Sequence, residues 1–157
     1  MSFFENTRKP VGLGGKIMVA MMNFGHSAMA EWGLRFLQPA PDAMVLDCGC
    51  GLDNTGRACD TGRCKIYNLA FPVVIAVRQQ LLPAGEREQN IPCDLKDPAW
   101  FDRIDATGGA VFFASGVFYY FLTERVRELV QGMADAFPGG VLVFDAANRT
   151  AVKMIAK

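Results

Sequence analysis

The chain has 157 residues, 51% of them hydrophobic, and its 16 Lys and Arg residues balance 16 Asp and Glu residues. This length and apolar content are sufficient for one well-packed domain. The charge balance leaves no net charge that would steer the chain toward nucleic acids or anionic membranes, and no basic run interleaved with aromatic residues is present. We therefore expect no nucleic acid and no membrane as partner.

Two further features of the composition concern the cellular compartment. The five cysteines follow no secreted disulfide pattern and include an odd thiol, so we expect a reducing, cytoplasmic environment. Cys48 and Cys50 are separated by one residue only, unlike common zinc-ligand pairs, so no metal site is predicted. Residues 110–122 are apolar but contain Ser115 and Gly116, and they fall short of the roughly 20 residues that span a bilayer.

Strand and helix patterns alternate along the chain, which predicts an α/β fold with a mostly parallel sheet of about five strands. An amphipathic helix at 16–37 comes first, and we expect it to cover the site. Strands are predicted at 43–47, at 64–69, up to 93, at 110–114 and at 141–144. Helices are predicted in the short crossover at 55–62, at 72–80, at 98–103 and at 123–137. Asp97 and Thr123 are the predicted N-caps of the last two helices.

The most informative segment is residues 43–51, an apolar strand that ends in an acidic residue and a two-glycine turn. Without Cβ atoms, Gly49 and Gly51 let the backbone N–H groups approach a ligand, and Asp47 adds a carboxylate beside them. A dinucleotide motif needs a third glycine, but Asn54 occupies that position. A cationic ligand group therefore suits the turn better than a pyrophosphate, and an ordinary strand-to-loop turn is the alternative.

These residues resemble a known family. Residues 45–51 are similar to the first motif of class I S-adenosylmethionine-dependent methyltransferases. Further motifs in the same order resemble the leucine carboxyl methyltransferase and tetracenomycin-type O-methyltransferase branch, namely 51–54, 66–78, 81–83, 93–100 and 137–145. The resemblance covers about residues 43–157 and implies a Rossmann-like class I fold with helices on both faces of the sheet.

The resemblance also predicts how the chain is organised. Residues 10–16 and 22–26 resemble the leader of another class I methyltransferase group, so we divide the chain into a helical leader at 1–40 and a cofactor domain at 41–157. Class I domains usually carry seven strands, so five imply truncation at the C-terminus. An open sheet edge would permit self-association.

The cofactor implied by the resemblance is S-adenosyl-L-methionine. Asp47 and the turn formed by Gly49, Cys50 and Gly51 would hold its methionine part. Relatives place an acidic residue for the ribose hydroxyls at the position of Ala70, and alanine has no acceptor. We therefore consider Asn68 as the substitute, although a neutral amide makes weaker hydrogen bonds than a carboxylate.

Three more candidates follow later strands. By resemblance, Asp94 and Leu95 fit the adenine site, although Asp94 could equally cap the next turn. Ser115 ends the fourth strand, where the ligand crevice of such sheets opens. Tyr119 and Tyr120 come just after it and are candidates for an acceptor pocket or for the core.

The predicted function is methyl transfer from this cofactor to a carboxylate or hydroxyl of a small-molecule acceptor, by direct in-line attack. No catalytic residue is assigned. His26 could reach over the cleft, and Asp145 is either a cap or a site residue. A non-catalytic binding module of the same fold is the main alternative, followed by a fragment of an NAD-binding oxidoreductase.

Overall fold

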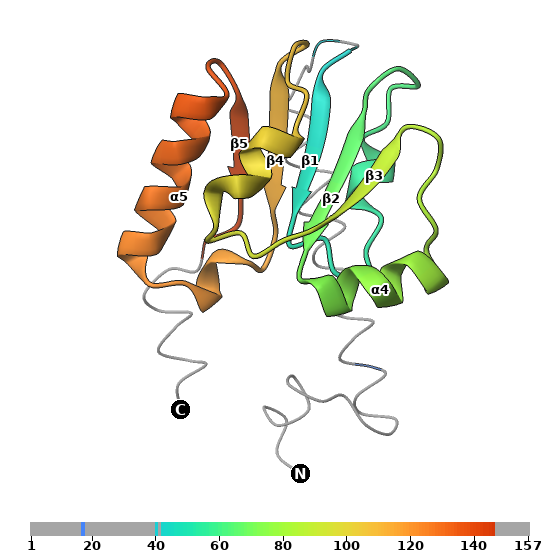
Figure 1. Cartoon of the computed structure of the whole chain (residues 1–157), viewed down its shortest axis with the longest axis horizontal. Coiled ribbons are helices and arrows are strands. Elements are labelled where there is room, and N and C mark those ends of the chain that lie inside the picture. Colours follow the sequence, from blue (N-terminus) through green and yellow to red (C-terminus); the bar gives the residue numbers. More distant parts are fainter. Residues whose placement is uncertain (1–16, 18–39, 41, 147–157) are drawn as a thin grey trace. The chain divides into compact units, whose positions relative to one another are not determined.

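The computed structural model describes residues 17, 40 and 42–146, and it shows a five-stranded parallel sheet with helices on both faces (Figure 1). The strands are β1 (Met44–Cys48), β2 (Ile66–Ala70), β3 (Glu88–Pro92), β4 (Ala110–Ala114) and β5 (Val141–Phe144). Their spatial order is β3-β2-β1-β4-β5. The predicted fold class is therefore confirmed. The predicted helix at 16–37, apart from Ile17, and His26 lie outside the described residues, so the proposed leader stays a prediction.

Four of the five described helices lie at predicted positions, and the short η2 was not predicted. The five helices are α3 (Thr55–Ala58), α4 (Pro72–Leu81), η1 (Pro98–Arg103), η2 (Phe118–Tyr120) and α5 (Thr123–Ala136). The Asp97 side chain caps η1 by accepting a hydrogen bond from the Ala99 N–H at 3.0 Å, as predicted. However, η1 is a tight 3₁₀ helix, and Thr123 is the first helical residue of α5 rather than its cap, a position that Leu122 occupies.

One face of the sheet carries the main core, under η1 and α5. Side chains that alternate along the strands, such as Leu46 and Phe112, point to this face and meet Trp100 from η1 and Met133 from α5. Trp100 stacks on Phe137, with ring centroids 6.3 Å apart. This aromatic contact joins the two helices to the sheet and to each other.

The opposite face is covered by α3 and α4. Ile75 of α4 packs against Ala70 and Cys50, and these three buried residues form a second, smaller hydrophobic cluster. A Cβ on Gly56 of α3 would lie 2.7 Å from the Cγ2 atom of Ile66, so only glycine lets α3 approach β2 this closely. This face therefore holds α4 beside the turn that follows β1.

The connection after β1 runs to the face covered by α3, and the connection after β4 runs to the face covered by α5. The two segments that leave these neighbouring strands therefore diverge. β1 lies between β2 and β4, and the chain order reverses at this point. Parallel sheets open a crevice at such a switch point, outside the carboxyl ends of the strands. The described residues contain no helix that is long and apolar enough to cross a membrane.

Candidate functional site

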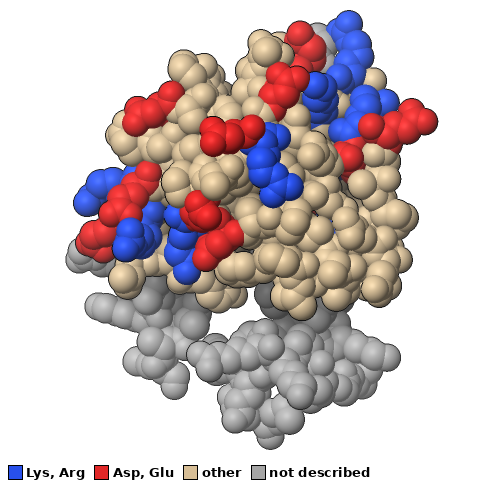
Figure 2. Space-filling view, in the orientation of Figure 1, with Lys and Arg blue, Asp and Glu red and all other residues tan. Residues whose placement is uncertain are grey.

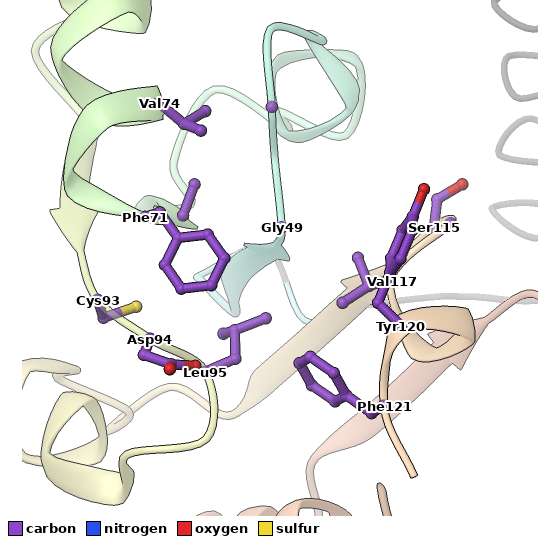
Figure 3. Close-up of a pocket in the computed structure, with 13 residues that line it drawn as sticks. Gly49, Phe71, Val74, Cys93, Asp94, Leu95, Ser115, Val117, Tyr120 and Phe121 are labelled. Atoms are coloured by element: carbon purple, nitrogen blue, oxygen red, sulfur yellow. The ribbon is translucent and has the colours of Figure 1, made fainter. Parts of the chain in front are cut away.

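A cavity of about 250 Å³ lies at the carboxyl end of the sheet. In Figure 3, residues that follow β2 and β3 form one side of it, and residues that follow β4 form the other, with Gly49 between them. Its lining combines the glycine turn with mainly apolar side chains, namely Gly49, Gly51, Ala70, Phe71, Val74, Cys93, Asp94, Leu95, Ser115, Gly116, Val117, Tyr120 and Phe121.

The glycine turn has the geometry that its sequence predicts. Gly49 adopts a φ of 78° and Gly51 a φ of 50°, both in the left-handed region that L side chains rarely adopt. A Cβ on Gly49 would also lie 2.4 Å from the Cγ2 atom of Val117. The turn is anchored to β2, because the N–H groups of Gly49 and Cys50 donate to the Leu69 carbonyl at 2.7 and 3.2 Å.

The structure brings five of the eight predicted cofactor residues to the cavity: Gly49, Gly51, Asp94, Leu95 and Ser115. Asp94 is the only one of these with an ionisable side chain. It lines the cavity and at the same time accepts a hydrogen bond from the Lys96 N–H at 3.0 Å. The two roles considered for Asp94, turn formation and a place in the site, are therefore compatible.

Asn68, suggested as the substitute for the missing ribose acceptor, does not line the cavity, and its role toward a ribose stays a prediction. Its side chain is 1% exposed and its Nδ2 atom donates to the Oδ1 atom of Asn90 across β2 and β3, at 3.0 Å. Ala70, two residues further on, reaches the cavity instead. The end of β2 therefore offers the cavity no side-chain acceptor.

The side chains of Asp47 and Cys50 are buried and do not line the cavity, and their contact with the cofactor stays a prediction. Burial raises the pKa of the Asp47 carboxyl well above its usual range, and the negative charge of Asp53 adds to this, while the Arg78 guanidinium opposes it. The Oδ2 atom of Asp47 has no hydrogen-bond partner among the described residues. Burial likewise raises the pKa of the Cys50 thiol to about 12, so this thiol is protonated and unreactive.

Several lining residues escaped the sequence analysis. Phe71, Val74 and Cys93 follow β2 and β3, and Val117 and Phe121 follow β4. Their common signal is position, since each comes within a few residues of the carboxyl end of a strand. From the sequence, an apolar side chain at such a place is interpreted as part of the hydrophobic core. Only the packing shows that it lines a cavity.

The loop after β4 is held by the end of β5. The Asp145 carboxylate accepts a hydrogen bond from the Gly116 N–H at 2.7 Å, so Asp145 acts as a cap that fixes the loop. Tyr120, an acceptor-pocket candidate, lines the cavity, whereas Tyr119 does not. Burial, and after it the carboxylate of Asp145, raises the pKa of the Tyr119 hydroxyl. Among residues 42–146, no group of three or more His, Cys, Asp or Glu side chains could hold a metal ion.

A parallel sheet of this order, with a glycine turn after β1 and a cavity at the switch point, is a Rossmann-like fold, the architecture that class I S-adenosylmethionine-dependent methyltransferases also have. The comparisons confirm the resemblance to this class. No family model matches the chain. Over 127 residues it is 28% identical to the tetracenomycin polyketide synthesis O-methyltransferase TcmP of Streptomyces glaucescens, covering 80% of this chain and 47% of that protein. The chain thus spans about half the length of this curated relative.

Solved structures agree on the fold. An O-methyltransferase family protein from Burkholderia thailandensis superposes with a TM-score of 0.58 at 18% identity, over 86% of this chain and 41% of that one. The magnesium protoporphyrin IX methyltransferase of Synechocystis PCC 6803, solved with bound S-adenosylhomocysteine (SAH), gives 0.58 at 16% identity, over 98% of this chain and 72% of that one. These values establish a shared architecture.

Proposed function

We propose that this chain is the cofactor-binding part of an S-adenosyl-L-methionine-dependent O-methyltransferase that acts on a carboxylate or hydroxyl of a small molecule. The observation that carries the proposal is the glycine turn after β1, which opens on a cavity opposite Asp94. The similarity to a tetracenomycin O-methyltransferase supports transfer to oxygen. S-adenosylhomocysteine or S-adenosylmethionine is bound in several of the similar folds.

The described residues fit this cofactor in three ways. The N–H groups of Gly51 and Leu52 have no hydrogen-bond partner within 42–146, so they are free to donate to a carboxylate. Asp94 supplies an acceptor for an exocyclic amine, and Leu95 offers an apolar surface to a flat ring. Ala70 supplies nothing to the ribose hydroxyls, so we expect moderate affinity.

When bound, the cofactor supplies a methyl group on a sulfonium, which an acceptor oxygen displaces in line. The chain's own contribution is orientation and the exclusion of water. Tyr120 and Phe121 of the segment after β4 face Phe71 across the cavity (Figure 3). An apolar enclosure of this kind leaves an acceptor oxygen less solvated and therefore more nucleophilic.

Calorimetric titration with SAH tests the proposal. The wild-type chain should bind SAH with micromolar affinity, and Asp94→Ala should weaken binding by about tenfold, the effect of one charge-assisted hydrogen bond. Asp105→Ala is the matched control, because Asp105 is exposed, pairs with Lys65 at 2.6 Å and does not line the cavity. A folded wild-type chain that binds no SAH would contradict the proposal.

A non-catalytic binding module of the same fold is the second candidate, and Ala70 is the observation that favours it. Such a module would bind SAH but transfer no methyl group to any acceptor. Incubation with radiolabelled S-adenosylmethionine and a panel of phenols and carboxylic acids separates the two. An NAD-binding fragment predicts protection from thermal unfolding by NAD, which we do not expect.

A further inference from the structure

Arg78 is a buried cation that binds the glycine turn from behind. It lies on α4, its side chain is 1% exposed, and its Nη1 atom donates to the carbonyl oxygens of Gly51 at 3.3 Å and Asp53 at 2.6 Å. Burying a guanidinium is unfavourable unless it is paired or well hydrogen-bonded. Arg78 forms no ion pair among the described residues, and its two hydrogen bonds there both run from Nη1 to backbone carbonyls, while its buried Nε has no partner among them.

The direction of these carbonyls determines the direction of the neighbouring amides. In a planar trans peptide the C=O and N–H groups point to opposite sides. Because the Gly51 carbonyl points to Arg78, the N–H of Leu52 points away from the guanidinium. This N–H is one of the two turn amides without a partner within 42–146. Arg78 therefore selects which side of the turn displays free donors.

Contacts that do not involve Arg78 also hold α4 on the sheet. Ile75 is 3% exposed and anchors the helix against Ala70 and Cys50. The Phe71 carbonyl accepts hydrogen bonds from the Val74 and Ile75 N–H groups and closes the first turn of α4. The hydrogen bonds of Arg78 go to the turn and not to these anchors of α4, so its buried charge acts on the turn.

We propose that Arg78 is a positioning residue for cofactor binding: it holds the 51–53 turn so that its free amides are presented to the methionine carboxylate of the cofactor. The inference rests on the proposed function and extends it to a residue outside the cavity lining. Arg78 does not touch the ligand. Its two hydrogen bonds preorganise the turn, so that binding requires no reordering of the backbone.

The experiment compares SAH binding and thermal stability for the wild-type chain, Arg78→Lys, Arg78→Ala and Met133→Ala. Met133 lies on α5, away from the turn, and is 4% exposed. Truncating it should lower the melting temperature, while SAH affinity measured below that temperature should stay unchanged. Arg78→Ala should weaken binding at least tenfold at the same temperature, since two charge-assisted hydrogen bonds are lost. Arg78→Lys keeps one donor group near the carbonyls and should recover part of the affinity.

Chemical rescue separates positioning from general stability. About 20 mM guanidinium chloride, far below denaturing concentration, should restore part of the SAH affinity of Arg78→Ala but not of Asp94→Ala, with sodium chloride as the salt control. Arg78→Ala with wild-type affinity, or an affinity loss equal to that of Met133→Ala without rescue, would overturn the inference. If the wild-type chain itself binds no SAH, the proposed function fails first. In that case, amide exchange at 51–54 still tests whether Arg78 holds the turn. Exchange that is faster in a folded Arg78→Ala chain, and that guanidinium slows again, would support this role.

Discussion

At the scale of single residues, the site depends on backbone geometry more than on reactive side chains. Gly49 combines a φ of 78° with a contact that leaves no room for a Cβ, and the N–H groups of Gly51 and Leu52 have no partner among the described residues. Among the described residues that line the cavity, Asp94 is the only one with a carboxylate. Such a site binds and orients, as expected for a reaction whose activated group arrives with the cofactor.

The geometry at Gly49 predicts a strong effect of one methyl group. Gly49→Ala should destabilise the chain by about 2–4 kcal/mol, because left-handed strain adds to a clash with Val117. Gly62→Ala is the control, since Gly62 has a φ of 87° but no atom within 4 Å of the added Cβ. It should destabilise by about 1 kcal/mol. Urea unfolding followed by circular dichroism measures both, and equal losses would contradict the role of the Val117 contact.

The buried carboxyl of Asp47 predicts a pH dependence of stability. Because its pKa in the folded chain is raised by burial and by Asp53, deprotonation is disfavoured in the fold, with Arg78 as the opposing charge. Its contribution is therefore fully present below the usual pKa of an aspartate and is lost as pH rises through the raised value. Burial and, to a smaller extent, the charge of Asp47 also raise the thiol pKa values of Cys48, Cys50 and Cys59, so these thiols stay protonated.

Asp47→Asn should accordingly be more stable than the wild-type chain at pH 8, and the difference should shrink toward pH 4. Melting temperatures across this range test the prediction. The pH dependence expected for Asp105→Asn is the opposite. The hydrogen bond to Lys65 lowers the pKa of Asp105, so the stability that this pair gives the wild-type chain is lost as pH falls. A wild-type chain that is more stable than Asp47→Asn only at high pH would contradict the assignment.

At the scale of elements, η1 and α5 form the cover of the main core. Trp100 is 1% exposed, lies 4.3 Å from Phe101 and 6.3 Å from Phe137 between ring centroids, and donates its indole N–H to the Leu95 carbonyl at 3.3 Å. Leu95 lines the cavity. The aromatic cluster therefore supports both the fold and one wall of the site.

Trp100→Ala should destabilise the chain by about 3–5 kcal/mol, as expected for a large buried aromatic side chain. SAH affinity should also fall, because the Leu95 carbonyl loses its partner. Val73→Ala on α4 is the control, since Val73 is 72% exposed and should change stability by less than about 0.5 kcal/mol. Denaturant titration gives the stability, and calorimetry gives the affinity. Unchanged SAH affinity in a folded Trp100→Ala chain would show that the aromatic cluster does not support the wall of the site.

At the scale of the whole molecule, two apolar surfaces are candidates for self-association. Within the described residues β5 pairs only with β4, and its Val141 and Phe144 are 44% and 52% exposed. The second surface is α4, where Val77 and Leu81 are exposed and which carries few charged residues in Figure 2. An edge strand with unpaired backbone groups is the stronger template for pairing.

We expect the chain to self-associate through β5 in a concentration-dependent way. Light scattering during size-exclusion chromatography should give a mass above 17.2 kDa at high concentration, and Val141→Lys with Phe144→Lys should lower it. Val77→Lys with Leu81→Lys is the matched pair on α4. If only the α4 pair lowers the mass, the interface lies on that helix, and a monomer at every concentration would contradict self-association.

Much of the fold could be predicted from local pattern. The strands at 110–114 and 141–144 and the start of α4 at Pro72 agree to the residue, because apolar runs, prolines and glycines mark these boundaries. The strand predicted at 64–69 begins at Ile66 instead. Its start depends on pairing with Val45, a contact between distant segments that no local pattern contains.

By itself the sequence determined the α/β class, the glycine turn and the strand ends that meet at the cavity, because these depend on periodicity and on the rule that parallel strands end at one edge. Tertiary structure decided the rest. Asn68 faces Asn90 because β2 and β3 pair in that register. Asp47 is buried, and Arg78 binds a backbone carbonyl of the 51–53 turn because α4 packs beside this turn. Burial and hydrogen-bond partners are properties of packing between segments far apart in the chain, so they exist only once the chain has folded.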